Sequence, residues 1–268
     1  MDLVRQVWSH NLYRELAIFN VYLSRFPVIV IDTEFPGFIR STPRGAPKEH
    51  LYQDLKFNLN HLKILQLGLT LVDENGNVGM TWEFTFSDFD EQTDLSNPTS
   101  IQFLKNKGLD FKKQREEGIR SAEFQLAFLP ILCSNRIVKW VTFHGIYDVA
   151  YLLKLMVIKS MPESVVEFAI IARCFLGTVS DLKYIIRNCE YLLNGELGLK
   201  KLAKLLNIVN DIPTHHLAGF DSLLIASAYA KMKKMHEFSS ENLDGFLYGL
   251  YYRIRGHKIP WFNPYYLH

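Results

Sequence analysis

The sequence predicts a mixed α/β protein with helices on the faces of a central sheet. Three observations support this fold class: a run of four β-branched residues at 28–31, a hairpin pattern over residues 62–86, and an apolar strand at 137–143 that a helical pattern follows directly. With 268 residues, 48% of them hydrophobic, the chain is long enough for a large core, and no linker divides it. We therefore expect one domain over residues 1–250 and a separate C-terminal tail over 251–268.

The first third of the chain predicts a helix and a three-stranded meander. Apolar residues recur at helical spacing over residues 3–23, which predicts an opening amphipathic helix. The run at 28–31 is typical of a buried strand, and Pro36-Gly37 ends it. After a loop at 40–50 and a short helix at 51–59, strands are predicted at 62–72 and 80–86. An Asn75-Gly76 turn joins these two strands.

The rest of the chain is predominantly helical by pattern. Short helices are expected in the polar region 87–117, and the strand at 137–143 passes into a helix at 146–158 across His144-Gly145. The lysines of the segment 198–206 indicate a solvated helix face. The aromatic and basic tail, 251–268, has no assignable role. The remaining helices are predicted at 121–133, 162–175, 180–187, 198–206 and 218–235.

Composition excludes several classes of protein. The net charge of +2 argues against tight non-specific binding to duplex nucleic acid, although it allows a local basic groove. The chain has three widely spaced cysteines and no C-x-x-C pair, which fits a reducing compartment. The first ten residues lack the apolar core of a signal peptide, and no apolar run approaches the ~18 residues of a membrane span. We expect an intracellular, soluble protein.

Asp32 and Glu34 form the first candidate site. Side chains alternate along a strand, so both carboxylates project from one face at the end of an apolar strand. Two desolvated carboxylates repel each other, and a divalent cation turns that cost into a binding site. The alternative is a strand that runs out into solvent with two hydrated charges at its tip.

Two further acids stand at the starts of predicted helices. Asp148 lies in the first turn after the strand–helix step, where acids are also common because they interact favourably with the helix dipole. Asp221 lies among apolar neighbours near the start of the late helix, and it could equally be such a first-turn acid. Five residues separate His216 from Asp221, about 140° around a helix, so His216 is expected in the approach loop, free to reach the site.

Together these residues match the needs of two-metal phosphodiester hydrolysis. Four carboxylates suit hard ions such as Mg²⁺ or Mn²⁺, which activate water and steady the leaving oxygen. A histidine of ordinary pKa can take the proton from the attacking water. We therefore expect two divalent metal ions as cofactors.

The same motifs resemble a known family, the DEDD exonucleases with a catalytic histidine. More narrowly they are similar to the CAF1/Pop2 poly(A) ribonucleases of the CCR4–NOT complex. The resemblance runs from about residue 4 to residue 250. It rests on Asp32-Thr33-Glu34-Phe35-Pro36-Gly37, on residues 62–70, on Phe143-His144-Gly145-Ile146-Tyr147-Asp148, and on residues 216–224.

The resemblance implies a fold, a reaction and roles for particular residues. The fold would be RNase H-like and the reaction 3′-to-5′ shortening of mRNA poly(A) tails with release of AMP. Asp32, Glu34, Asp148 and Asp221 would be metal ligands, with Asp32 bridging both ions. His216 would be the general base, with His215 as the competing histidine. Implied partners are single-stranded poly(A) RNA, a NOT1-like scaffold and a CCR4-like deadenylase, in the cytoplasm and nucleus.

Some residues depart from the family pattern, and some concern the substrate. Phe220 stands where the family has Ser, and Gly145-Ile146 replaces a Ser-Gly pair; both could tune activity. Phe35 and His144 are expected to stack on or position the terminal nucleotide, as could Phe38, although a core role suits Phe35 equally. Cations that could meet phosphates, or simply face solvent, follow the first strand: Arg40, Arg44 and Lys48.

Three alternatives stay open at the level of sequence. One is a DEDD exonuclease that acts on other RNA or on DNA 3′ ends. Another is a non-catalytic adaptor of a CCR4–NOT-like complex, which loss of an acid or of the histidine would favour, yet all five residues are present. The last is an ordinary α/β domain whose acids are caps and surface charges, which the joint pattern of motifs argues against.

Overall fold

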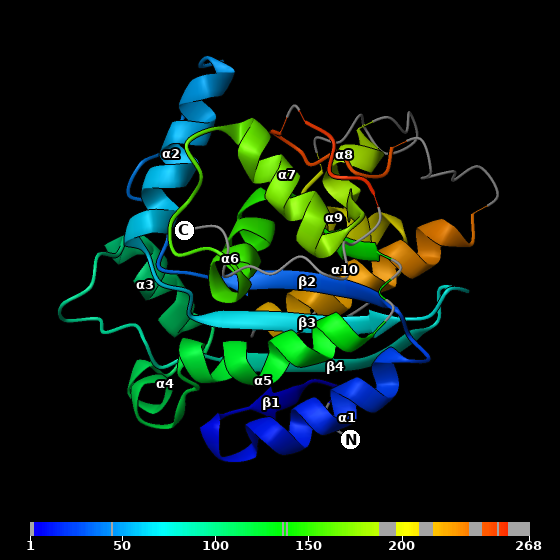
Figure 1. Cartoon of the computed structure of the whole chain (residues 1–268), viewed down its shortest axis with the longest axis horizontal. Helices are drawn as coiled ribbons and strands as arrows, with labels where there is room; N and C mark the ends of the chain where they lie inside the picture. The colour runs from blue at the N-terminus through cyan, green and yellow to red at the C-terminus, as the bar shows by residue number, and fades with distance from the viewer. Residues whose placement is uncertain are drawn as a thin grey trace.

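A six-stranded sheet forms the centre of the computed structural model (Figure 1). The structure describes residues 3–43, 45–135, 137, 139–187, 197–208, 217–235, 243–250 and 252–256. The strands follow the order β1-β4-β3-β2-β5-β6 across the sheet. They are β1 (Arg5–Val7), β2 (Val28–Glu34), β3 (Gln66–Val72), β4 (Val78–Thr85), β5 (Lys139–Thr142) and β6 (Val179–Asp181).

The predicted meander forms the middle of this sheet. Strands β2, β3 and β4 are antiparallel neighbours, whereas β1, β5 and β6 join as parallel strands. The β3–β4 turn is closed by Asp73, whose Oδ1 accepts hydrogen bonds from the backbone N–H groups of Asn75 at 2.9 Å and Asn77 at 2.7 Å. Gly76 adopts φ +83° there, a conformation that favours glycine. The hairpin prediction is confirmed.

Helices cover both faces of the sheet. In Figure 1, α10 crosses behind β2 and β3, whereas α5 and α6 lie in front of the sheet. No helix among the described residues has the length and the apolar character that a bilayer crossing requires. The described helices are α1 (Leu12–Leu23), α2 (Lys48–His61), α3 (Pro98–Asn106), α4 (Phe111–Glu117), α5 (Ser121–Ser134), α6 (Ile146–Met156), α7 (Val165–Leu176), α8 (Leu182–Ile186), α9 (Leu199–Leu205) and α10 (Ala218–Lys233), with a 3-10 turn at Ser9–Asn11.

The alternation of β2 divides the apolar interior into two cores. Ile29 and Ile31 belong to the large core shared with α1, α5, α6 and α7. Val28 and Val30 belong to the smaller core under α8, α9 and α10. Both faces of β2 are therefore buried, which explains why its sequence is a continuous β-branched run rather than an alternating pattern. The expectation of a single mixed α/β domain is confirmed.

Two element predictions were wrong, for related reasons. The expected helix over residues 3–23 begins only at Leu12, because Arg5–Val7 pairs with β4 as a parallel edge strand. The expected helix over 180–187 begins with a strand, β6, whose three residues are all buried. Its polar members are satisfied internally, since Ser180 donates to Asp244 and Asp181 accepts backbone N–H groups. A three-residue strand is too short for a period-two pattern to appear.

The described part of the tail packs beside β6. Ile254 is buried, its carbonyl accepts from Val179 N at 3.2 Å, and its N–H donates to the Gly245 carbonyl at 2.6 Å. The predicted boundary after residue 250 thus falls inside a stretch that continues onto the domain. The rest of the tail lies outside the described residues.

Candidate active site

The alternation of side chains along β2 determines which face of the sheet Asp32 and Glu34 occupy. Asp32 and Glu34 continue the series of Val28 and Val30, so their side chains emerge on the α10 face of the sheet. Thr33 continues the opposite series and faces the α6 side. The strand therefore delivers two carboxylates to one side of the sheet at its carboxyl end.

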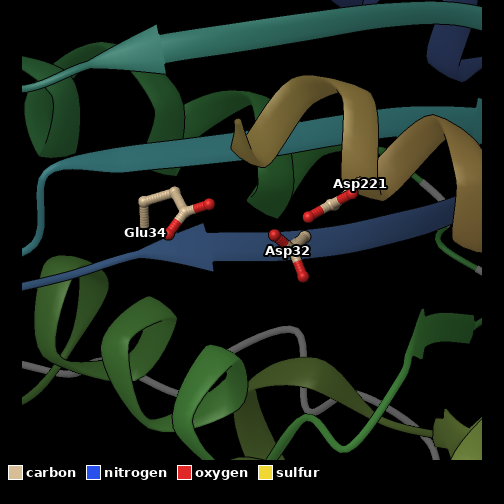
Figure 2. Close-up of side chains that lie close together, drawn as sticks. All are labelled: Asp32, Glu34 and Asp221. Atoms are coloured by element: carbon tan, nitrogen blue, oxygen red, sulfur yellow. The ribbon is translucent and has the colours of Figure 1, made fainter. Parts of the chain in front are cut away.

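Helix α10 brings Asp221 to the same place. The helix approaches β3 closely because position 68 has no side chain: a Cβ atom on Gly68 would lie 1.9 Å from the Ala218 carbonyl oxygen. Oxygen atoms of Asp32, Glu34 and Asp221 all lie within 4.8 Å of one another. Figure 2 shows the Asp221 carboxylate directed from α10 toward that of Asp32 on β2.

Asp148 approaches from the other side of β2. It lies in the first turn of α6, as the sequence predicts, and it is buried. Thr33 Oγ1 donates to its Oδ1 at 2.6 Å, and Thr142 Oγ1 donates to its Oδ2 at 3.1 Å. The structure thus brings three of the four predicted ligands into one cluster, while the fourth is a neighbour of Asp32 held by two threonines.

The pKa values of these acids are all raised. Loss of hydration raises the pKa of Asp32 well above its usual range, and the charges of Asp148 and Asp221 add to this. Burial is also the main cause for Glu34, whose pKa rises to about 8, and for Asp148, at about 7. Four acids therefore share a region that penalises their ionisation.

Two lysines partly offset this penalty at Asp221. Burial raises the pKa of Asp221 to about 6, while the positive charges of Lys200 and Lys107 pull it down. Lys107 is the C-cap residue that follows α3, and Lys200 lies in the first turn of α9. The lysines of α9 were interpreted as a solvated face, and for Lys200 this is incomplete, because its charge acts on the site. Nothing local in the sequence pairs it with Lys107, 93 positions away.

The donor set fits hard divalent cations. Three carboxylates converge, their repulsion disfavours ionisation in the absence of a cation, and carboxylate oxygen is the donor that Mg²⁺ and Mn²⁺ prefer. A cation at this position would relieve the repulsion between the carboxylates, which adds to burial in raising the pKa values of Asp32 and Glu34. Asp32, Glu34 and Asp221 are therefore the residues that could hold it, with Asp148 adjacent.

The predicted base, His216, lies outside the described residues, as does His215. The adjoining Leu217 is described: it is the extended N-cap residue of α10, with φ −124° and ψ 176°. The roles assigned to both histidines stay predictions.

The two predicted substrate residues are placed differently. Phe35 is partly buried and packs on Tyr147 and Tyr151, at centroid distances of 5.4 Å and 5.1 Å, so it contributes to the core. His144 is exposed in the loop before α6, with φ +62°, and its ring meets Tyr248 edge-on. The backbone of that loop is held by buried Asp181, which accepts from His144 N at 2.8 Å and Gly145 N at 3.2 Å.

Comparisons with known proteins show which family this chain belongs to. The family described as CAF1 family ribonuclease matches residues 7–127. The probable CCR4-associated factor 1 homolog 7 of Arabidopsis thaliana is 38% identical over 260 residues, covering 92% of this chain and 93% of its own. The poly(A) ribonuclease pop2 of Schizosaccharomyces pombe is 39% identical over 240 residues, covering 87% of this chain and 70% of its own.

Solved structures extend the similarity to the fold. Pop2p of S. pombe, in a form with Mg²⁺ and Mn²⁺ bound, superposes with a TM-score of 0.82 at 36% identity, over 93% of this chain and all of its own. Yeast CAF1 co-crystallised with the NOT1 MIF4G domain gives 0.77 at 28% identity, over 91% and 96%. The matches confirm the RNase H-like fold that the resemblance implies.

Proposed function

Because the chain belongs to the CAF1 family of ribonucleases, we propose that it is a metal-dependent 3′-to-5′ exoribonuclease that shortens poly(A) tails. The observation that carries this proposal is the cluster of Asp32, Glu34 and Asp221 at the end of β2. A family likeness alone would suit an inactive relative equally well. The assembled carboxylates support an enzyme rather than an adaptor that keeps only the fold.

The residues divide the work of hydrolysis as follows. Asp32, Glu34 and Asp221 would hold divalent cations, with Asp148 as the predicted fourth ligand. When bound, such ions polarise the scissile phosphate and offset the charge that develops on it. His216 is proposed to take the proton from the attacking water. Lys107 and Lys200 supply positive charge beside Asp221, where the phosphates of an RNA strand need it.

Substrate and partner are proposed from the relatives. The S. pombe relative is named a poly(A) ribonuclease, and we propose the same substrate for this chain. The yeast relative was crystallised with a NOT1 MIF4G domain, which supports a NOT1-like scaffold as a partner. A CCR4-like deadenylase is a further proposed partner, since several relatives are named CCR4-associated factors.

A labelled RNA tests activity and specificity together. The substrate carries a 5′ label and ends in about twenty adenosines that follow a mixed sequence, and it is incubated with the full chain and Mg²⁺ or Mn²⁺. We expect a ladder that shortens from the 3′ end and pauses at the first non-A base. Asp32→Asn, which keeps the shape of the side chain and removes a charge, should abolish it.

Each other outcome has a defined meaning. Equal trimming of adenosine and of other 3′ ends would retain the exonuclease and reject the poly(A) preference. An unaltered ladder with Asp32→Asn would mean that the nuclease resides elsewhere or in a contaminant. Absence of shortening by folded wild-type protein with either metal would reject the enzyme and favour an adaptor.

A further inference from the structure

A buried carboxylate on β4, Glu83, lies outside the three-acid cluster. Its side chain is 2% exposed. In the sheet register Asp32 pairs with Gly68, and Gly68 pairs with Glu83, so the three residues form one row across β2, β3 and β4. Paired residues project to the same face. Glu83 therefore faces α10, as Asp32 does, with only a glycine between them.

Glu83 holds the first turn of α10. Its Oε2 accepts a hydrogen bond from Gly219 N at 2.8 Å, and its Oε1 accepts from Gln66 Nε2 at 3.2 Å. The contact is close, since a Cβ atom on Gly219 would lie 2.7 Å from Glu83 Cβ. Gly219 precedes Asp221 by two residues in that turn. The position of the Asp221 carboxylate thus depends on the hydrogen bond by which Glu83 holds the backbone of this turn.

The charge of Glu83 has no cation beside it in the bonds that the structure describes. Its donors are amide N–H groups, those of the Gly219 backbone and of the Gln6 and Gln66 side chains. The equally buried Glu15 is different, because Arg5 lies at 2.6 Å and Arg14 at 3.0 Å from its oxygens. Burial of a carboxylate without a cation beside it is costly, and here the hydrogen bonds to Glu83 offset only part of that cost.

That charge reaches the acids of the site. It contributes to the raised pKa of Glu34, after burial and the charge of Asp221, and it also helps to raise the pKa of Asp32, after burial and the charges of Asp148, Asp221 and Glu34. Negative charge that hinders ionisation of a carboxylate also favours a cation bound to it. Glu83, in the same row of the sheet as Asp32, therefore adds one more negative charge near the three-acid cluster.

We propose that Glu83 is a positioning residue of the cation site. It seats the first turn of α10 so that Asp221 meets Asp32 and Glu34, and its charge strengthens cation binding without ligating the ion. This inference rests on the proposed function, since it presupposes that the three acids bind a divalent cation.

Two measurements on the full chain test it. The first is Mn²⁺ affinity by calorimetric titration, and the second is the melting temperature in EDTA. Glu83→Gln keeps an oxygen to accept from Gly219 and removes the charge. We expect Mn²⁺ binding about five- to tenfold weaker, with a melting temperature equal to or above that of the wild type, because one like charge has left the site. The matched control Glu15→Gln should lower the melting temperature and leave Mn²⁺ affinity unchanged.

The outcomes separate the possibilities. Unchanged Mn²⁺ affinity in folded Glu83→Gln would overturn the inference. A parallel fall of affinity and melting temperature would also overturn it, since that is the signature of a merely structural residue. Wild-type protein that binds no Mn²⁺ would instead contradict the proposed function, and that result is distinguishable because it does not involve the variant.

Discussion

A single residue, Thr33, separates the acids of the site into two groups. It lies between Asp32 and Glu34 in sequence, faces the other side of β2, and bonds to Asp148. Asp148 is thereby held next to the strand while Asp32 and Glu34 face Asp221. Side-chain alternation thus lets one strand contribute to both sides of the site.

Two lysines offer a test at the scale of single residues. Lys107 and Lys200 lower the pKa of Asp221, so their charges lie near the place where a phosphate would bind. We expect Lys107→Gln and Lys200→Gln each to raise KM for an oligoadenylate about three- to tenfold at low salt, with kcat little changed, because they attract substrate without reacting. Steady-state kinetics at two salt concentrations measures this.

Neighbouring lysines serve as matched controls. Lys201 is also exposed on α9, and Lys105 is paired with Glu91 on α3. Lys201→Gln and Lys105→Gln should leave KM close to the wild-type value. Equal effects in all four variants would show that only the general charge of this surface matters.

At the scale of elements, the site depends on how closely α10 approaches the sheet. Gly68→Ala places a Cβ atom 1.9 Å from the Ala218 carbonyl oxygen, and a backbone atom cannot turn aside as a side chain can. We expect the helix to shift, with a loss of about 2 kcal/mol or more in unfolding free energy and weaker Mn²⁺ binding. Urea denaturation and calorimetric titration measure the two effects.

A second glycine provides the comparison. A Cβ atom on Gly198 would meet nothing within 4 Å, and that residue has ordinary φ −77°. Gly198→Ala should therefore change unfolding free energy by less than about 1 kcal/mol. A Gly68→Ala variant that is as stable as Gly198→Ala and binds Mn²⁺ normally would refute the close-packing account.

The elements also show what sequence can and cannot reveal. The β-branched run of β2, the Asn75-Gly76 turn and the long apolar pattern of α10 are local signals, and each element formed where predicted. Strand β6 was missed because its buried polar residues are satisfied by distant partners such as Asp244.

Some residues of the site could also be predicted from the sequence, and others could not. Motif order pointed to the acids of β2, α6 and α10, and strand alternation predicted that Asp32 and Glu34 share one face. The approach of Asp221 depends on the packing of α10 against β3, which alternation does not reveal. Glu83 could not, because Thr81, Glu83 and Thr85 look like the solvent face of an amphipathic strand until α10 is known to cover them. Lys107 and Lys200 likewise meet only through the tertiary fold.

At the scale of the whole molecule, proton binding at the site couples to stability. The pKa values of Glu34 (about 8), Asp148 (about 7) and Asp221 (about 6) lie above their ordinary values near 4. At pH values between the ordinary pKa and the raised pKa of each acid, the folded protein binds more protons than the unfolded chain. Its stability therefore falls as pH rises through this range. Metal-free protein should therefore lose stability from pH 5 to pH 8.5.

Denaturation across this pH range, in EDTA and in saturating Mg²⁺, checks the coupling. Mg²⁺ should remove most of the fall, because it binds the ionised folded state and not the unfolded chain. Glu34→Gln serves as the control for other titrating groups, and in EDTA it should flatten the profile. A wild-type profile that rises with pH, or that Mg²⁺ does not alter, would contradict the linkage.

The most direct test of the account is the position of the cation itself. Crystals of the full chain soaked in Mn²⁺ and measured at the manganese absorption edge would show it as an anomalous peak. The account predicts a peak bounded by the carboxylates of Asp32, Glu34 and Asp221, which is absent from crystals of Asp32→Asn. Ordered carboxylates without a peak between them at saturating Mn²⁺, or a peak only elsewhere on the molecule, would contradict it.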